Sequence, residues 1–363
     1  MTATTIQRAS RPLILGLGLM ATASQVVAAG HGDEDIDGSF NNGDHGSAGW
    51  ADKTFIGGYG ELHLNLNKGD KNEIDFHRWV LFINHRFNDK IALYGEFELE
   101  HSLAGAPDKP GEVELEQAYV DIALDGGMNF KAGLFLLPVG TLNETHEPPT
   151  FYGVERNPIE KNIIPTTWWE AGLGLSGSLD NGLKWEVAAH SGLEVESDPA
   201  NAKHWSIRGG RNKVAEAAAE DAAVTARLTY SGNGFTVAGF AQYQSDITQG
   251  AANADATLLG ATLDASMGNF RLRGLYAQWD IGGAAAKAAG HDDQWGYYIE
   301  PSYKINDNIG VFVRYAEWED YKGDHDHTSV GINYWPIDNV VFKADYTDQD
   351  DGESVNLGVG YQF

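Results

Sequence analysis

The feature that most constrains the fold is an alternation of apolar and polar residues that starts at Thr54 and continues to Phe363. The segment EIDFHRWVLFINHRF illustrates this pattern. Successive side chains of a strand point to opposite faces, so each such segment is typical of a β-strand with one apolar side. Sixteen strands are expected, near residues 54–67, 73–87, 90–101, 112–124, 129–137, 168–180, 182–193, 221–231, 234–245, 254–267, 269–281, 291–305, 308–319, 325–336, 339–349 and 352–363.

The connections between these segments alternate between short and long. The short ones are rich in Asn, Asp and Gly, as tight hairpins require, and include NDK, SGNG and NDN. The long ones lie near 102–111, 138–167, 194–220, 246–253, 282–290 and 320–324, and those near 68–72 and 350–351 fall on the same side. Outer-membrane barrels have this asymmetry and an even strand number. We therefore predict an all-β fold, a sixteen-stranded antiparallel transmembrane β-barrel. The alternative, a soluble sandwich, would bury a face too charged for a dry core.

The N-terminal region precedes the barrel and has two parts. In residues 1–29, Arg8 and Arg11 precede the apolar run PLILGLGLMATA, and Val27-Ala28-Ala29 resembles a cleavage site. This pattern predicts a signal peptide, since a membrane anchor would be longer. Residues 30–53 are polar and glycine-rich, which predicts a flexible acidic tail that is either solvated or binds cations weakly. The barrel is expected to span 54–363.

Charge and motif content exclude several functions. The chain carries 52 acidic and 25 basic residues, a net charge of −27, and no cysteine. We expect no nucleic-acid partner, no disulfide and no cysteine chemistry. His190 and Ser191 are adjacent, so on a strand they point to opposite faces and cannot form a nucleophile–base pair. The sequence GDHDH at 323–327, expected on a loop, is an incomplete metal-ligand set. We predict no enzyme activity, no cofactor and no metal site.

The segment near 138–167 differs from the other connections. It contains five prolines, among them Pro148 and Pro149, which oppose both helix and central strand. It also carries apolar residues such as Phe151 and Ile163, and long connections of this kind are usually functional. We expect it to fold inward and narrow a pore; the alternatives are a lid over the mouth or a contact with a neighbouring subunit. Its charged residues at the narrowest point would be Glu144, Glu147, Glu155, Arg156, Glu160 and Lys161.

Alternation also assigns charged strand residues to the polar, inner face. The candidate pore-lining residues are Arg78, Arg86, Glu96, Glu98, Glu100, Asp121, Lys131, Arg227 and Arg314, with Glu61, His63, Glu186, His190, Glu300, Lys304, Lys343 and Asp345 on the same face. Rings of charge set ion preference in channels, although such groups can also simply solvate the wall and pair with one another. The connection near 194–220 carries Lys203, Arg208, Arg211 and Lys213, which would attract anions or, alternatively, flank a short solvated helix, VAEAAAEDAA.

The sequences KAGLFLLPVG and NETHEPPTFYGVERNPIEKNIIPTTWWEAGLGLSG resemble the porins of the phosphate-selective porin O and P superfamily, most specifically over 131–193. The last strand, which ends in Phe363, is similar to the C-terminal strand of outer-membrane proteins. The resemblance implies a homotrimer in the outer membrane of a Gram-negative bacterium, in contact with lipid and lipopolysaccharide, and an inward-folded third outer loop.

Three functions follow from these observations. The first is a passive diffusion channel for small hydrophilic solutes and ions. The second is an anion- or phosphate-selective porin, for which the basic candidates are scattered and matched by carboxylates: Arg78, Arg86, Arg156, Lys161, Arg227, Arg271, Arg273 and Arg314. The third is a surface adhesin or receptor barrel without a transport role.

Overall fold

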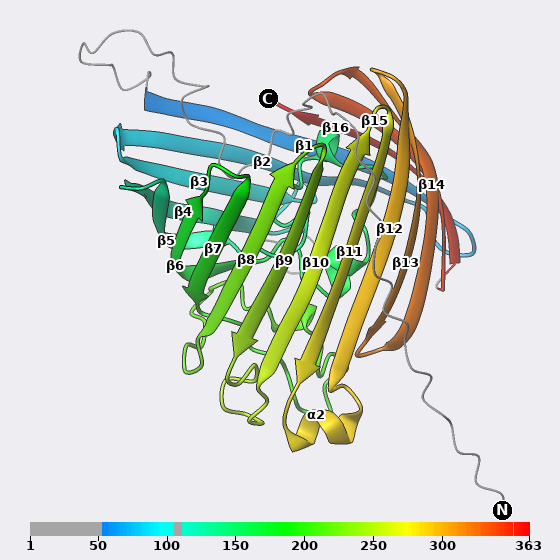
Figure 1. Ribbon diagram of the computed structural model, residues 1–363. Helices are drawn as coiled ribbons and strands as arrows, with labels where there is room; N and C mark the ends of the chain where they lie inside the picture. The colour runs from blue at the N-terminus through cyan, green and yellow to red at the C-terminus, as the bar shows by residue number, and fades with distance from the viewer. Residues whose placement is uncertain (1–52, 105–110, 351) are drawn as a thin grey trace, which may run out of the picture.

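The computed structural model describes residues 53–104, 111–350 and 352–363. The expected signal peptide and all but the last residue of the expected tail lie outside the described residues. Sixteen strands form one closed barrel in which every strand pairs antiparallel with its neighbours (Figure 1). The strands are β1 Thr54–Asn67, β2 Glu73–Asn88, β3 Ile91–Glu100, β4 Val113–Leu124, β5 Met128–Leu136, β6 Trp169–Ser178, β7 Leu183–His190, β8 Ala223–Gly232, β9 Phe235–Gln244, β10 Ala256–Met267, β11 Phe270–Ile281, β12 Asp293–Asn306, β13 Ile309–Asp320, β14 Gly323–Ile337, β15 Val340–Gln349 and β16 Gly352–Gln362.

The predicted fold class and strand number are confirmed. One local prediction is wrong, because β14 begins at Gly323 and the GDHDH sequence lies on a strand rather than on a loop. Asp320 pairs with Gly323, so only residues 321–322 join β13 to β14. Gly323 has a φ of +120°, a conformation that glycine adopts without strain. Because residues 323–327 contain no apolar side chain, the alternation of apolar and polar residues did not indicate a strand there.

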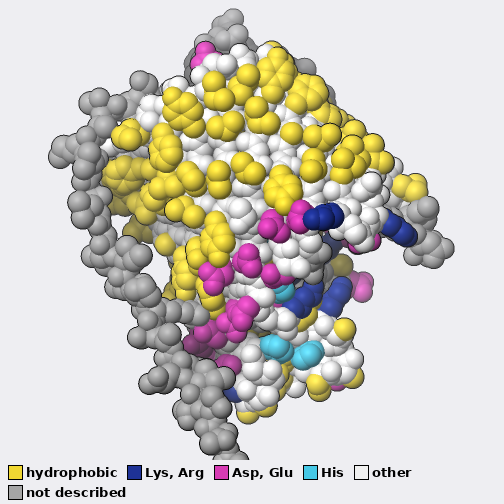
Figure 2. Space-filling view, turned by 90° about the vertical axis from the view of Figure 1, so that its right-hand side faces the viewer, with side chains coloured by type: hydrophobic (Ala, Val, Ile, Leu, Met, Phe, Trp, Pro, Cys, Tyr) yellow, Lys and Arg dark blue, Asp and Glu magenta, His cyan; other side chains and the backbone are white. Residues whose placement is uncertain are grey.

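The wall of the barrel has an apolar outer face. Large apolar side chains on alternate strand positions are exposed, for example Ile74, Leu173 and Leu259. Figure 2 shows hydrophobic side chains over the upper part of one side of the wall, with charged side chains gathered below them. An exposed apolar surface of this extent is unusual for a soluble monomer and is typical of a lipid-facing barrel. None of the α-helices among the described residues is long and apolar enough to cross a membrane.

The barrel closes where β1 meets β16. Tyr59 pairs with Gln362, and the backbone groups of Gly58 and Phe363 exchange two hydrogen bonds of 2.9 and 2.8 Å. Among the described residues, the helical turns lie in the longer connections. They are η3 Pro148–Thr150 and α1 Ile159–Asn162 between β5 and β6, η4 Arg208–Gly210 between β7 and β8, and α2 Ala284–Ala289 between β11 and β12. The stretch VAEAAAEDAA is not helical.

The largest apolar cluster joins the β5–β6 connection to the strands. Ile163 and Trp168 of this connection are fully buried with Trp205 of the β7–β8 connection and Trp279 of β11. The indole Nε1 of Trp279 donates a 2.9 Å hydrogen bond to the carbonyl oxygen of Ile163. The aromatic and isoleucine content that set this connection apart in the sequence therefore packs against strand residues.

Candidate functional site

The connection between β5 and β6, residues 137–168, is called the 137–168 segment below. Its two ends are held together by Asn143. The side-chain amide of Asn143 donates to the carbonyl oxygens of Leu137 and Trp168, at 2.8 and 2.9 Å, and its Oδ1 accepts from the Trp168 amide at 2.7 Å. A buried backbone group without a partner is costly, so this one side chain satisfies the groups that leave the sheet.

A second buried side chain orders the middle of the segment. Glu160 is fully buried and accepts hydrogen bonds from the backbone amides of Thr141 and Leu142, the latter at 2.6 Å. Its other carboxylate oxygen accepts from Asn157 at 2.8 Å. Burial raises the pKa of Glu160 above its usual range, while the donors around it act in the opposite direction. Glu160 therefore orders the segment internally through these hydrogen bonds.

The tip of the segment is attached to strands that lie far from β5 and β6 in the barrel order. Tyr152 packs on Phe312 of β13 and Trp335 of β14, with ring centroids 5.4 and 5.5 Å apart. Arg314 of β13 donates to the Tyr152 carbonyl oxygen at 2.6 Å. The backbone amide of Val154 donates to Asp345 of β15, also at 2.6 Å.

Strand glycines make room for the tip. A Cβ on Gly310 of β13 would lie 2.1 Å from the hydroxyl oxygen of Tyr152, and one on Gly360 of β16 would lie 2.2 Å from Cβ of Pro148. Real Cβ atoms do not approach other atoms this closely, so these two strand positions require the absence of a side chain. The segment and these strands are therefore complementary in shape at the two glycine positions.

Three arginines assigned to the inner face each form an ion pair, and two of these pairs are buried. Arg78 contacts Glu61 of β1 at 2.6 Å, and both side chains are 3% exposed. Arg314 contacts Glu300 of β12 at 2.6 Å with the same exposure. Arg227 of β8 contacts Glu186 of β7 and, at 2.5 Å, Glu144 of the 137–168 segment. The partners of Arg78 and Arg314 lie on neighbouring strands, and Arg78 pairs with β1 instead of the carboxylates of β3.

The other predicted site residues lie in varied surroundings, as follows. Glu155 contacts His63 at 3.0 Å, Asp121 accepts from Asn129 at 2.7 Å, Arg156 donates to Thr167 at 3.0 Å, and the ammonium group of Lys131 lies 4.5 Å from the ring centroid of Phe135. Glu147 is buried, Arg86 and Glu100 are half-buried, and Lys161 is exposed. The predicted pore-lining residues are therefore spread over the barrel wall and the 137–168 segment.

Glu96 and Glu98 belong to a dense acidic cluster on β3 and β4. Glu96 lies with Glu116 of β4 and with His146 of the 137–168 segment. Glu98 lies with Glu114 and Glu116. In both groups one oxygen or nitrogen atom of each residue is within 4.8 Å of the others. Neighbouring strands and a segment distant in sequence meet here, so spacing along the chain did not reveal the cluster.

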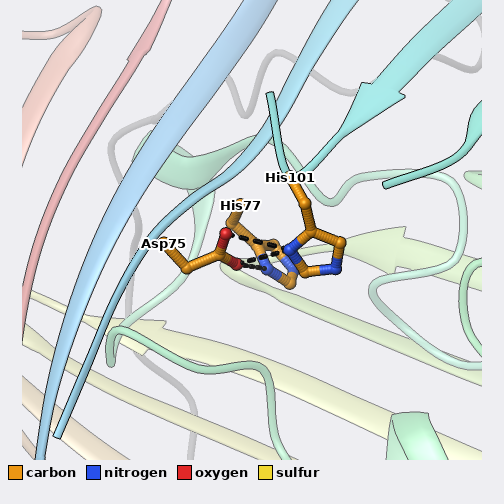
Figure 3. A group of neighbouring side chains, drawn as sticks. All are labelled: Asp75, His77 and His101. Carbon is orange, nitrogen blue, oxygen red and sulfur yellow. Dashed lines mark hydrogen bonds and ion pairs between the residues drawn. The ribbon is translucent and has the colours of Figure 1, made fainter. Parts of the chain in front are cut away.

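A second group of ligand-type side chains lies where β2 and β3 approach the long connections (Figure 3). Nδ1 of His101 lies 2.8 and 2.9 Å from the two carboxylate oxygens of Asp75, and Nδ1 of His77 lies 3.2 Å from one of them. The His77 ring also stacks on that of His63, at 4.8 Å between centroids. The carboxylate of Asp75 thus accepts from both imidazoles.

The basic residues of the β7–β8 connection are bound to protein groups. Arg208 donates to the carbonyl oxygens of Lys161 and Thr166, at 3.1 and 2.9 Å. Arg211 donates to the carbonyl oxygen of Thr167. Lys213 contacts Glu112 and Glu114. Three of the four cations therefore hold the connection against the 137–168 segment and β4.

The family model described as phosphate-selective porin O and P matches residues 56–356. The chain belongs to this family. The porin is 29% identical over 338 residues to an uncharacterized protein of Aquifex aeolicus (strain VF5), covering 81% of this chain and 75% of that protein. It is similar in structure to an anion-selective porin from Comamonas acidovorans, with a TM-score of 0.61, 11% identity, and coverage of 85% of this chain and 99% of that chain.

A trimer form of OmpT, an outer membrane protein of Vibrio cholerae, has a TM-score of 0.54 and 12% identity, covering 85% of this chain and 99% of that chain. At these identities the two solved structures support the barrel fold alone. Family membership and the closed sixteen-stranded barrel together make this porin a diffusion channel of the outer membrane.

Several residues that shape this site were missed by sequence reasoning. Asn143, Asn157 and His146 were not singled out, and Glu116 was not assigned to the inner face. For Asn143 and Asn157 the sequence offered only a general indication of such a role. A proline-rich buried segment leaves many backbone groups without ladder partners, and Asn side chains are suited to bind them.

Proposed function

We propose that the 137–168 segment lies within the barrel and narrows the channel, through which small hydrophilic solutes and ions diffuse passively. The observation that carries this proposal is the attachment of the tip, at Tyr152 and Val154, to β13, β14 and β15. These strands are eight or more places from β5 in sequence order, so the segment crosses from one part of the wall to another.

We further propose that selectivity among ions is weak. Arg78, Arg227 and Arg314 are each matched by a carboxylate within 2.6 Å. A neutralised pair contributes little net potential to a pore, whereas an anion-selective pore requires uncompensated cations. The anion- or phosphate-selective alternative is therefore ranked second, and the adhesin alternative, which needs no open pore, third.

The test is the conductance of the purified protein in a planar bilayer, measured with the zero-current potential in a salt gradient. Stable conductance steps with a small zero-current potential support the proposal. A strongly anion-selective pore that millimolar phosphate blocks would replace it by the second function. A folded barrel that never conducts would contradict both transport functions.

The finer assignments belong to the same proposal. We propose export by a cleaved signal peptide of residues 1–29, a homotrimer in contact with lipid and lipopolysaccharide, and no enzymatic activity or cofactor. His190 bonds to Thr225 at 2.8 Å, whereas Ser191 donates to Glu170, in keeping with the absence of a nucleophile–base pair. Mass spectrometry of the protein from membranes checks the new N-terminus, and its mass in detergent checks the trimer; a full-length chain or a monomer would contradict these points.

A further inference from the structure

Three hydrogen-bond acceptors converge in the acidic cluster without a donor among them. Nε2 of His146 lies 3.5 Å from Oε2 of Glu116 and 3.8 Å from Oε1 of Glu96. The three residues are 3%, 1% and 2% exposed, respectively. Each of these three atoms is buried and lacks a hydrogen-bond partner. Buried polar atoms without partners are rare in native proteins and call for a specific explanation.

The surroundings fix which atoms are free. Nδ1 of His146 lies 3.2 Å from the carbonyl oxygen of Asn143, which can only accept, so Nδ1 carries the hydrogen. In the neutral ring Nε2 then presents a lone pair to the two carboxylates. Gln117 donates to Oε2 of Glu96 at 2.6 Å and leaves Oε1 directed at the histidine. Hydrogen bonds of this kind, which the second ring nitrogen donates to a carbonyl oxygen and an amide donates to a carboxylate, orient metal ligands in proteins.

We propose that Glu96, Glu116 and His146 bind a divalent transition-metal ion, with Zn²⁺ the best match, and that the ion ties the 137–168 segment to the barrel wall. One imidazole and two carboxylates are a ligand set that suits Zn²⁺ better than Ca²⁺ or Mg²⁺, which prefer oxygen ligands alone. Ligands about 2.1 Å from a tetrahedral ion are about 3.4 Å apart, so the observed 3.5 and 3.8 Å require only a small contraction.

A series of carboxylates leads from solvent to this site. Going inward from residue 112, the side chains of Glu112, Glu114 and Glu116 are 53%, 8% and 1% exposed. Glu98 and Glu100 of β3 lie against them and complete two further groups of three carboxylates. At the outer end the ammonium group of Lys213 contacts both Glu112 and Glu114, which shows that this position accommodates a cation.

The charge around the site also favours a cation. Arg78 donates to the His146 carbonyl oxygen at 3.4 Å, but its charge is compensated by Glu61. Arg211, the other basic side chain that interacts with Glu116, also lies close to Glu100, Glu112 and Glu114. The carboxylates of Glu98 and Glu147 face the same region and add negative charge. Like charges in a low-dielectric interior repel strongly unless protons or a metal ion neutralise them.

The group formed by Asp75, His77 and His101 provides a matched comparison. Its carboxylate already accepts hydrogen bonds from both imidazoles, and its side chains are more exposed. It contains the same kinds of ligand but lacks the convergence of unpartnered atoms. A variant at His101 therefore controls for metal binding by any histidine and carboxylate on this barrel.

The experiment uses the full folded porin in detergent, treated with a chelator and titrated with ZnCl₂ by calorimetry. We expect one saturable site in the wild type and in His101→Ala, and an affinity reduced more than about 100-fold in His146→Asn and in Glu116→Gln. Two ligand variants are used so that a folding defect in one, detected by circular dichroism, leaves the other as the test. Hydrogen exchange should also slow on Zn²⁺ addition at residues 141–147 of the wild type but not of His146→Asn.

Three results would overturn the proposal. The first is a wild type without saturable Zn²⁺ binding, which would leave shared protons as the explanation for the close carboxylates. The second is binding that His101→Ala abolishes and His146→Asn retains, which would place the ion at Asp75. The third is binding at His146 without any change in hydrogen exchange of the segment, which would refute the tie to the wall. Each of these results is independent of the solute selectivity tested above.

Discussion

The anchor of the 137–168 segment can be tested at Tyr152, whose ring is 7% exposed between Phe312 and Trp335. Replacing a buried aromatic side chain by alanine costs about 3–5 kcal/mol, because contacts are lost and a cavity remains. The barrel wall pairs through sixteen strand ladders that this change leaves intact. We therefore expect the cost of Tyr152→Ala to fall mainly on the attachment of the segment.

The loss of about 3–5 kcal/mol corresponds to a roughly 150- to 5000-fold larger ratio of detached to attached segment. In single-channel recordings we expect Tyr152→Ala to show a higher mean conductance or frequent transitions to a larger open state. Tyr243→Ala is the matched control, since Tyr243 lies on the outer face and is 52% exposed. Identical recordings for Tyr152→Ala, Tyr243→Ala and the wild type would refute the argument that the tip narrows the channel.

Three further predictions concern the wall and its contacts. Arg78→Gln removes the arginine partner of the buried Glu61 and leaves it only His63, so it should lower the free energy of unfolding by about 3 kcal/mol. Lys90→Gln, in an exposed pair, should cost less than about 1 kcal/mol, and similar losses for both variants in a urea titration would argue against the burial of the Arg78 pair. Gly310→Leu should displace the Tyr152 ring and reproduce the conductance change of Tyr152→Ala, and a wild-type recording from the folded variant would contradict the close packing. Arg208→Ala removes two hydrogen bonds to the segment and should increase protease cleavage near Lys161; equal cleavage rates would show that those bonds do not order it.

The barrel was predictable because its pattern is local. A strand reveals its two faces through a period of two, and the hairpin turns carry Asn, Asp and Gly, so sixteen strands were found with bounds mostly within two residues. The pattern failed where charged residues are dense, as at the start of β14, and where no periodicity exists. The short helix Ala284–Ala289 and the hydrogen bonds of Asn143 belong to such stretches.

The contacts of the candidate site were less predictable, since they join distant parts of the chain. Alternation placed Arg78, Glu96 and Arg314 on one face, but it did not reveal that Arg78 pairs with Glu61 or that His146 meets Glu96. The pair of Arg78 and Glu61 depends on the register of β1 against β2, and the contact of His146 depends on the path of the 137–168 segment, which has no repeating pattern. The expectation that no metal site exists rested on the absence of cysteine and of a local ligand motif, and neither observation bears on ligands from three separate elements.

The seam between β1 and β16 has a consequence for how the chain assembles. Every other pair of neighbouring strands is also adjacent in sequence, whereas the seam joins Tyr59 to Gln362. Enclosing a loop of roughly 300 residues, compared with roughly 15 for a hairpin, costs about 2.7 kcal/mol more in chain entropy. Until that seam forms, β1 and β16 each present a row of unpaired backbone groups that is able to pair with another chain. The porin therefore remains open to aggregation through these two strands until the last strand pairs with the first. The hydrogen bonds between Gly58 and Phe363 are part of the pairing that ends this exposure.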